Sequence, residues 1–222
     1  MKKLLFIPLI IISSYCFSQT YVGLKTGYSL LSTVSFKPDI DASIFTGKSL
    51  DYGLIIKNFD NKWVGFQGEI FVTQRGYNAP YNETNKFQRV NNYIELPIFM
   101  QFHINLKGVY LHGGAGCFAA YLTSAQEGVD TSGTMVLKKV HFNTLRDNRF
   151  DYGLTGGVGI SYEFKFGVFQ IEARVLYGYA DLYKYDYPNM PQQSKAVVQN
   201  ISFSYMYNLS KIGQKKKVVE NP

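Results

Sequence analysis

The chain has 222 residues and a formal net charge of +7, and its aromatic residues are 18 Tyr and 17 Phe against a single Trp. Two lysines (Lys2, Lys3) lie in a predicted N-terminal signal and four (Lys211, Lys215, Lys216, Lys217) in the C-terminal tail, which leaves about +1 on the body by this count. So small an excess excludes the broad basic surface of a nucleic-acid-binding protein, and the length is that of one domain.

Residues 1–18 predict a secretory signal peptide that is cleaved before Gln19. Two lysines follow the initiating methionine, Leu4–Ile12 is apolar, and small residues occur at Cys16 and Ser18, three and one before the cleavage site. A membrane-spanning helix is the alternative, but it needs about 20 apolar residues. A lipoprotein signal that uses Cys16 is a second alternative, which the bulky residue before this cysteine disfavours.

Eight segments alternate between apolar and polar residues, which predicts strands rather than helices. The fourth is the clearest, since an apolar residue stands at every second position from Ile94 to Ile104, with Glu95, Gln101 and His103 on the opposite face. On a helix, the six apolar residues would surround the whole circumference. In chain order, the predicted strands cover about residues 20–31, 49–58, 62–76, 91–104, 108–123, 150–164, 167–182 and 197–209.

The connections between these strands alternate in length. Residues 59–61, 105–107 and 165–166 form short turns, whereas residues 32–48, 77–90, 124–149 and 183–196 form long polar loops. A soluble β-sandwich, the alternative, has no reason to keep this alternation, but it is typical of outer-membrane barrels. The sequence therefore predicts an all-β fold, an eight-stranded antiparallel up-and-down transmembrane β-barrel of OmpA or OmpX size. The barrel covers residues 19–210, followed by a basic periplasmic tail over residues 211–222, and both chain ends lie in the periplasm.

The apolar faces have the length of a membrane span. The ten steps from Ile94 to Ile104 cover roughly 33 Å at about 3.3 Å per residue, and a tilt of about 40° reduces this to roughly 25 Å. We therefore expect outer-membrane lipid to contact these faces. Tyrosines at the ends of the apolar faces fit interfacial girdles: Tyr28, Tyr52, Tyr152, Tyr162, Tyr177, Tyr179, Tyr205 and Tyr207.

The opposite faces predict a closed, charged interior. An eight-stranded barrel is only wide enough for side chains to fill, and an unpaired buried charge costs several kcal/mol. One ion-pair network is therefore expected to plug the lumen: Lys25, Lys57, Glu69, Glu95, Glu172 and Arg174. A gated ion path is the functional alternative, but closely packed pairs leave no continuous water column. Pro97 has no N–H for the ladder, so a β-bulge is expected there.

The segment Tyr93–Phe102, YIELPIFMQF, resembles the "YLEIPLLLKY"-like hallmark of the Bacteroidetes outer-membrane β-barrel family, which includes PorT-like and porin family proteins. Tyr21–Gly27 looks like the first strand of that family, and Gly113–Gly116 like its glycine-rich fifth strand. The resemblance implies an eight-stranded outer-membrane barrel and no particular activity, although PorT itself is implicated in type IX secretion. The chain departs from many outer-membrane barrels in continuing past its last predicted strand.

No enzyme, cofactor or metal site is predicted. The histidines at 103, 112 and 141 have no Cys/His partner at metal-ligand spacing. Ser124 and His141 share the third long loop with Asp130 and Asp147, but a loop of this composition contains such residues by chance. Catalysis would need a positioned nucleophile and base.

Three functions remain open at this stage. The first is a structural or interaction role through the external loops, especially residues 124–149, with envelope or secretion proteins as partners. The second is a small-solute porin. The third is an accessory role in type IX secretion, as in PorT.

Overall fold

The computed structural model describes residues 19–37, 44–46, 50–59, 63–82, 85–131, 134–165, 167–184, 186–188 and 190–209. The predicted signal peptide and the predicted basic tail lie outside the described residues. Among the residues described, no helix is long and apolar enough to cross a membrane.

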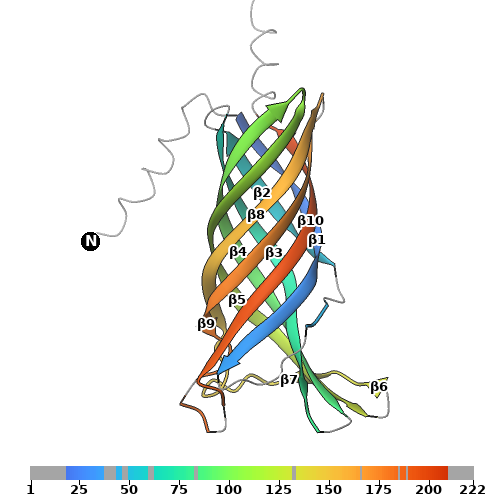
Figure 1. Ribbon diagram of the computed structural model, residues 1–222, viewed down its shortest axis with the longest axis vertical. Helices are drawn as coiled ribbons and strands as arrows, with labels where there is room; N and C mark the ends of the chain where they lie inside the picture. Colours follow the sequence, from blue (N-terminus) through green and yellow to red (C-terminus); the bar gives the residue numbers. More distant parts are fainter. Residues whose placement is uncertain are drawn as a thin grey trace, which may run out of the picture.

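Eight strands form a closed ring (Figure 1). Each strand is antiparallel to the next one in the ring, and the ring closes where the first strand pairs with the last. The predicted eight-stranded antiparallel up-and-down barrel is confirmed. The strands are β1 (Gln19–Lys37), β2 (Asp51–Phe59), β3 (Val64–Pro80), β4 (Lys86–Leu106), β5 (Val109–Thr131), β8 (Phe150–Phe164), β9 (Gly167–Asp181) and β10 (Gln193–Asn208).

The two ends of the barrel differ. The strand ends joined by the short connections 60–63, 107–108 and 165–166 lie at one end, the turn end, at the top of Figure 1. The strand ends joined by the connections 38–50, 81–85, 132–149 and 182–192 lie at the other, the loop end. Two short strands outside the ring, β6 (Thr134–Met135) and β7 (Lys138–Val140), pair with the last residues of β5 at the loop end.

The second long loop is much shorter than predicted. Residues 77–90 were expected to be a polar loop, but β3 and β4 continue through this segment in regular register from Tyr77↔Arg89 to Pro80↔Lys86. Only residues 81–85 connect them. Beyond the lipid-facing band a strand has water on its outer side, so it loses the apolar alternation that the prediction used.

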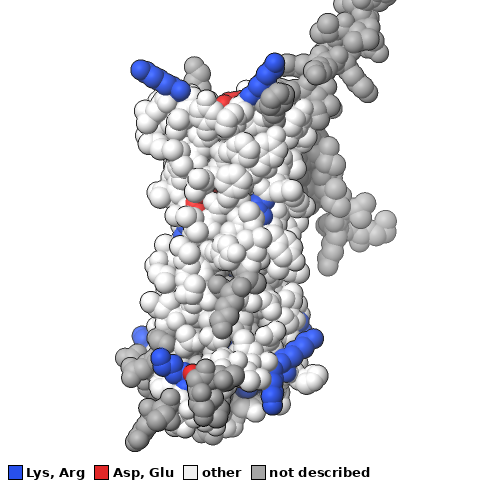
Figure 2. Space-filling view, turned by 90° about the vertical axis from the view of Figure 1, so that its right-hand side faces the viewer, with Lys and Arg blue, Asp and Glu red and all other residues white. Residues whose placement is uncertain are grey.

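The lipid-facing band matches the predicted faces. On β4, residues from Ile94 to Ile104 alternate between exposed and buried, with the apolar side chains outside and Glu95, Gln101 and His103 inside. Figure 2 shows Lys and Arg side chains at the two ends of the molecule, with a nearly uncharged band between them. Exposed aromatic side chains lie at both ends of this band, Trp63 and Tyr162 beside the turn end and Tyr177 toward the loop end. This arrangement fits a membrane with polar interfaces on both sides.

Pro97 does not form a bulge, contrary to the prediction. The β4–β5 register runs unbroken through Pro97↔Phe118, and its shift lies between Asn92 and Tyr93. On the other side, the β3–β4 ladder keeps the same register on both sides of the proline but skips the pairs between Gly68↔Ile98 and Phe71↔Glu95. The missing N–H is therefore accommodated by an interruption of the hydrogen bonding and not by an extra residue.

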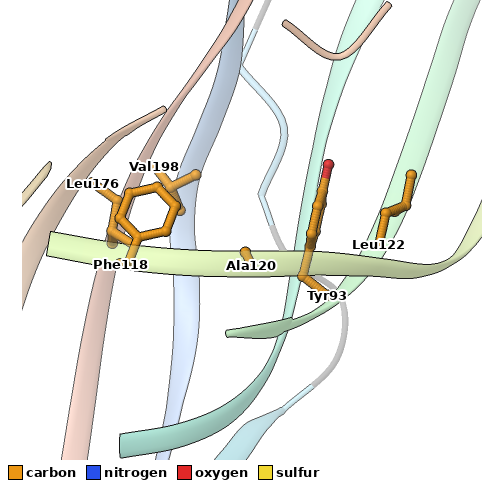
Figure 3. Close-up of a cluster of buried hydrophobic side chains, with 6 residues drawn as sticks. All are labelled: Tyr93, Phe118, Ala120, Leu122, Leu176 and Val198. Carbon is orange, nitrogen blue, oxygen red and sulfur yellow. The ribbon is translucent and has the colours of Figure 1, made fainter. Parts of the chain in front are cut away.

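Buried apolar side chains form two layers inside the barrel, beside its charged groups. One layer lies at the turn end and contains Tyr21, Ile55, Val168 and Met206. A second layer lies toward the loop end (Figure 3) and consists of Tyr93, Phe118, Ala120, Leu122, Leu176 and Val198. Buried aromatic and aliphatic side chains exclude water. The charged side chains beside these layers therefore interact more strongly with one another.

Two glycines of β8 provide a matched test of packing in the barrel wall. A Cβ on Gly153 would lie 2.0 Å from the backbone oxygen of Tyr177, whereas a Cβ on Gly156 would meet nothing nearer than 3.7 Å. We expect Gly153→Ala to lower the free energy of unfolding by about 1–3 kcal/mol, because the strands must move apart. Gly156→Ala should change it by much less. Urea unfolding of both variants checks this, and equal losses would contradict it.

Candidate functional site

Four of the predicted network residues meet in the lumen, and we call them the lumen cluster: Lys25 on β1, Glu69 on β3, and Glu172 and Arg174 on β9. Lys25 Nζ donates to both oxygens of Glu69 at 2.9 Å and to Glu172 Oε1 at 3.3 Å. Arg174 donates to the two oxygens of Glu69 at 2.6 and 3.1 Å, and its Nε contacts Glu172. The four side chains are 3% exposed or less, so two cations and two carboxylates neutralise each other out of contact with water.

Three glutamines add hydrogen bonds to the lumen cluster. Gln101 Nε2 and Gln170 Nε2 donate to Glu172 Oε2 at 3.0 and 3.1 Å, and Gln67 donates to Glu69. Lys57, the fifth predicted network residue, is joined only indirectly, since its Nζ donates to Gln170 Oε1 at 2.8 Å. The amides share the inner face with the charged residues, and this alternation was the signal that placed them there.

Glu95 lies outside the lumen cluster, so the predicted single network is two clusters in the structure. Glu95 pairs with Arg75, whose Nη1 also donates to Asp151 Oδ2 at 2.8 Å. The Arg75 guanidinium stacks on Tyr93 and Phe118, 4.8 and 5.0 Å from the ring centroids. Arg75 and Asp151 were not predicted as network members, although both continue the inward-facing alternation of their strands.

A third charged cluster lies at the loop end. Arg89 is completely buried, and its guanidinium donates to Glu127, to Asp147 Oδ1 at 3.2 Å and to the hydroxyl of Tyr183 at 3.1 Å. Arg146 donates to both oxygens of Asp147, at 3.0 and 3.1 Å. Two arginines and two carboxylates therefore balance each other here as well.

The stability that this loop-end cluster contributes depends on pH through the carboxyl group of Asp147. Burial by itself would raise the pKa of the Asp147 carboxyl, but hydrogen bonds from Arg146 and the backbone N–H of Asn143, with the charge of Arg89, outweigh burial. The pKa therefore lies below the ordinary value of 3.8. A depressed pKa contributes stability that is fully present above the ordinary value and is lost as the pH falls through the lower, folded-state value.

We expect Asp147→Asn to lower the free energy of unfolding by about 1–3 kcal/mol at pH 7, because Arg89 and Arg146 lose a charged acceptor. Below about pH 4 the parent protein should lose the same contribution, so the two stability curves should converge. Urea unfolding of both proteins between pH 3 and pH 7 measures this difference. A difference that stays constant down to pH 3 would show that the ionised carboxylate contributes nothing.

The loop end also contains a cleft of about 490 Å³, which we call the loop-end cleft. Aromatic side chains form its walls, among them Tyr77, Tyr81 and Phe87, and the charged residues Glu127 and Arg146 also line it. Tyr77 and Tyr183 both line the cleft, and their hydroxyl groups are 2.6 Å apart. This cleft was not predicted, because Phe36, Tyr77 and Phe87 of its lining lie on strands in segments that were predicted to be loop.

The residues considered for catalysis do not form a nucleophile–base pair. Ser124 Oγ accepts a hydrogen bond from Asn92 at 2.9 Å, and Asp147 is held by the two arginines. His141 is exposed. Within the described ranges, no three His, Cys, Asp or Glu side chains are grouped in a way that could hold a metal ion. That the protein is not an enzyme and needs no cofactor stays a prediction.

Comparison with known proteins gives structural likenesses of low sequence identity. Ail of Yersinia pestis, solved with the heparin analogue sucrose octasulfate, is 17% identical, with a TM-score of 0.40 over 85% of this chain and 99% of that one. OprG from Pseudomonas aeruginosa is 9% identical, with a TM-score of 0.48 over 86% and 95%. The outer membrane protease OmpT from Escherichia coli is 10% identical, with a TM-score of 0.37 over 86% and 96%. No curated protein matches the sequence.

Membership of a family is established from the sequence match. A model of the outer membrane protein beta-barrel domain matches residues 17–184, which include every strand of the ring except β10. This match covers well over half of the chain and agrees with the closed antiparallel ring and its apolar outer face. The chain therefore belongs to the outer membrane protein beta-barrel domain family and is a barrel of the outer membrane.

Proposed function

We propose that this outer-membrane barrel has a closed lumen and acts as a structural or interaction protein through its loop end. In this proposal a signal peptide over residues 1–18 directs export, the turn end and both chain ends lie in the periplasm, and the loop end lies outside the cell. Short connections at the turn end and longer ones at the loop end support this orientation, since outer-membrane barrels have short periplasmic turns.

The lumen cluster is the observation that carries the closed lumen. Its four charged side chains extend from β1, β3 and β9 into one shared set of contacts at 2.6–3.3 Å, and Gln101 adds a contact from β4. Buried side chains of the turn-end layer and of the layer with Tyr93 lie in the lumen as well. A solute would have to separate paired charges that have almost no exposure to water, and breaking a buried pair costs about 3–5 kcal/mol.

Conductance across planar lipid bilayers tests this proposal against the porin alternative. Purified full-length protein should give no reproducible conductance steps, while an established porin reconstituted in the same membranes should give them. Insertion is checked in parallel by protease protection of the barrel in vesicles made from the same lipids. Reproducible open-channel steps from the inserted protein would refute the closed lumen and favour a small-solute porin.

An accessory role in type IX secretion is the second candidate. It is supported by the resemblance of Tyr93–Phe102 to the hallmark of Bacteroidetes PorT-like barrels. Co-purification of secretion-machinery subunits with the tagged protein, from outer membranes in mild detergent, would support this role. Normal secretion in a deletion strain would count against it and leave the general interaction role.

A further inference from the structure

The loop-end cleft combines aromatic walls with one available donor and one available acceptor. Glu127 uses Oε1 for its contacts with Arg89 and Arg146, and among the described residues its Oε2 has no hydrogen-bond partner. Arg146 donates to Asp147 through Nε and Nη2. Its Nη1 likewise has no hydrogen-bond partner among the described residues. Arg146 Nη2 and Glu127 Oε1 are 3.6 Å apart, so the two groups lie side by side on the lining of the cleft.

The charges around the cleft limit the chemistry of a ligand. Arg89 and Arg146 are balanced by Glu127 and Asp147, so neither an anion nor a cation meets an uncompensated partner. A purely apolar group would remove water from Glu127 and Arg146 without replacing their hydrogen bonds, which is costly for charged groups. The ligand that fits is therefore neutral and carries both donors and acceptors beside an apolar face.

A sugar ring has this combination. Its C–H face packs on aromatic rings, while neighbouring hydroxyl groups can donate to a carboxylate and accept from a guanidinium at once. A cleft of about 490 Å³ lies within the usual range for small-molecule sites and holds one or two hexose units. Tyr81 lines the cleft and is 63% exposed, so its ring is accessible for such stacking.

We propose that the loop-end cleft binds a neutral sugar residue, with Glu127 and Arg146 on its hydroxyl groups and Tyr81 against its ring. The proposal rests on the proposed function only in its use of the loop end for recognition. Sugar binding can fail while the lumen stays closed, because the bilayer experiment measures the lumen alone.

Saturation-transfer NMR on the full-length protein tests the proposal. The protein is kept in an amine-oxide detergent, which has no sugar head group, and the probes are the methyl glycosides of glucose, galactose and mannose. At least one glycoside should receive saturation, strongest at its ring C–H protons. Absence of transfer to all three glycosides would overturn the proposal. Transfer to N-acetylphenylalanine amide and to none of the glycosides would also overturn it and indicate a peptide side chain as the occupant.

Two variants and a control connect binding to the cleft. Glu127→Gln keeps the size of the side chain but removes the charged acceptor, and Tyr81→Ala removes the stacking face. Each should weaken glycoside binding about tenfold or more. Tyr52→Ala, on the exposed outer wall of β2, should leave binding unchanged. The heat-dependent shift in gel migration verifies that each variant is folded, and unchanged affinity in folded Glu127→Gln and Tyr81→Ala would overturn the proposal.

Discussion

Replacing Glu69 by leucine is expected to lower the free energy of unfolding by about 3–5 kcal/mol, because the substitution breaks a buried ion pair from one side only. Lys25 and Arg174 share this carboxylate, with contacts of 2.6–3.1 Å, and Glu172 alone would remain to balance them. Urea unfolding of the protein refolded into lipid vesicles provides the measurement.

A charge-balanced double variant is the control for this effect. Lys25→Met combined with Glu69→Leu replaces one cation and one carboxylate by apolar side chains of similar volume. Arg174 then remains paired with Glu172. Because a buried pair is often replaced by apolar residues at little cost, the double variant should unfold within about 1–2 kcal/mol of the parent protein. A double variant that is less stable than Glu69→Leu alone would mean that pairing of charges is not what stabilises the lumen.

An arginine in place of Ile98 is expected to destabilise the barrel by about 2–4 kcal/mol in a bilayer, since it places a cation near the middle of the lipid-facing band. Ile98 is 63% exposed, so packing inside the barrel is not disturbed. Leu106 is 53% exposed and lies next to a turn at the end of the same strand. Leu106→Arg should therefore cost only about 0–1 kcal/mol.

The comparison of these two variants decides which solvent surrounds the barrel. Both side chains are exposed to a similar extent, so water on the outer face would make the two substitutions nearly equivalent. Unfolding of both variants from vesicles of one lipid composition measures the difference. Equal and small effects would show that the apolar face is not embedded in hydrocarbon.

The barrel itself was predictable because lipid on one side and packed charges on the other impose a strict alternation. Between Ile94 and Ile104 every side chain obeys this alternation, and the strand over Phe150–Phe164 agrees with its prediction at both ends. Where the outer side of a strand meets water, as between Tyr77 and Pro80, both faces tolerate polar residues. The pattern then no longer separates strand from loop.

The grouping of the charged residues was only partly predictable. Alternation shows that Glu95 faces inward, but it does not show how far along the barrel axis the side chain lies from Glu69. That distance depends on the stagger between neighbouring strands, which a single sequence does not reveal. Pro97 was misassigned for a related reason, since a proline can be accommodated by a bulge or by a skipped hydrogen bond, and the residue type does not distinguish them.

The pairing of β1 with β10, from Tyr21↔Asn208 to Lys37↔Gln193, has a consequence for biogenesis. The strand that closes the ring is the last of the eight in chain order, so a sheet that forms without it keeps two open edges. Contacts of such high sequence separation form slowly, and open edges invite aggregation during the delay. The polypeptide is therefore expected to need chaperones that hold it unfolded on its way to the membrane, and a version truncated before β10 should aggregate rather than assemble as a narrower cylinder.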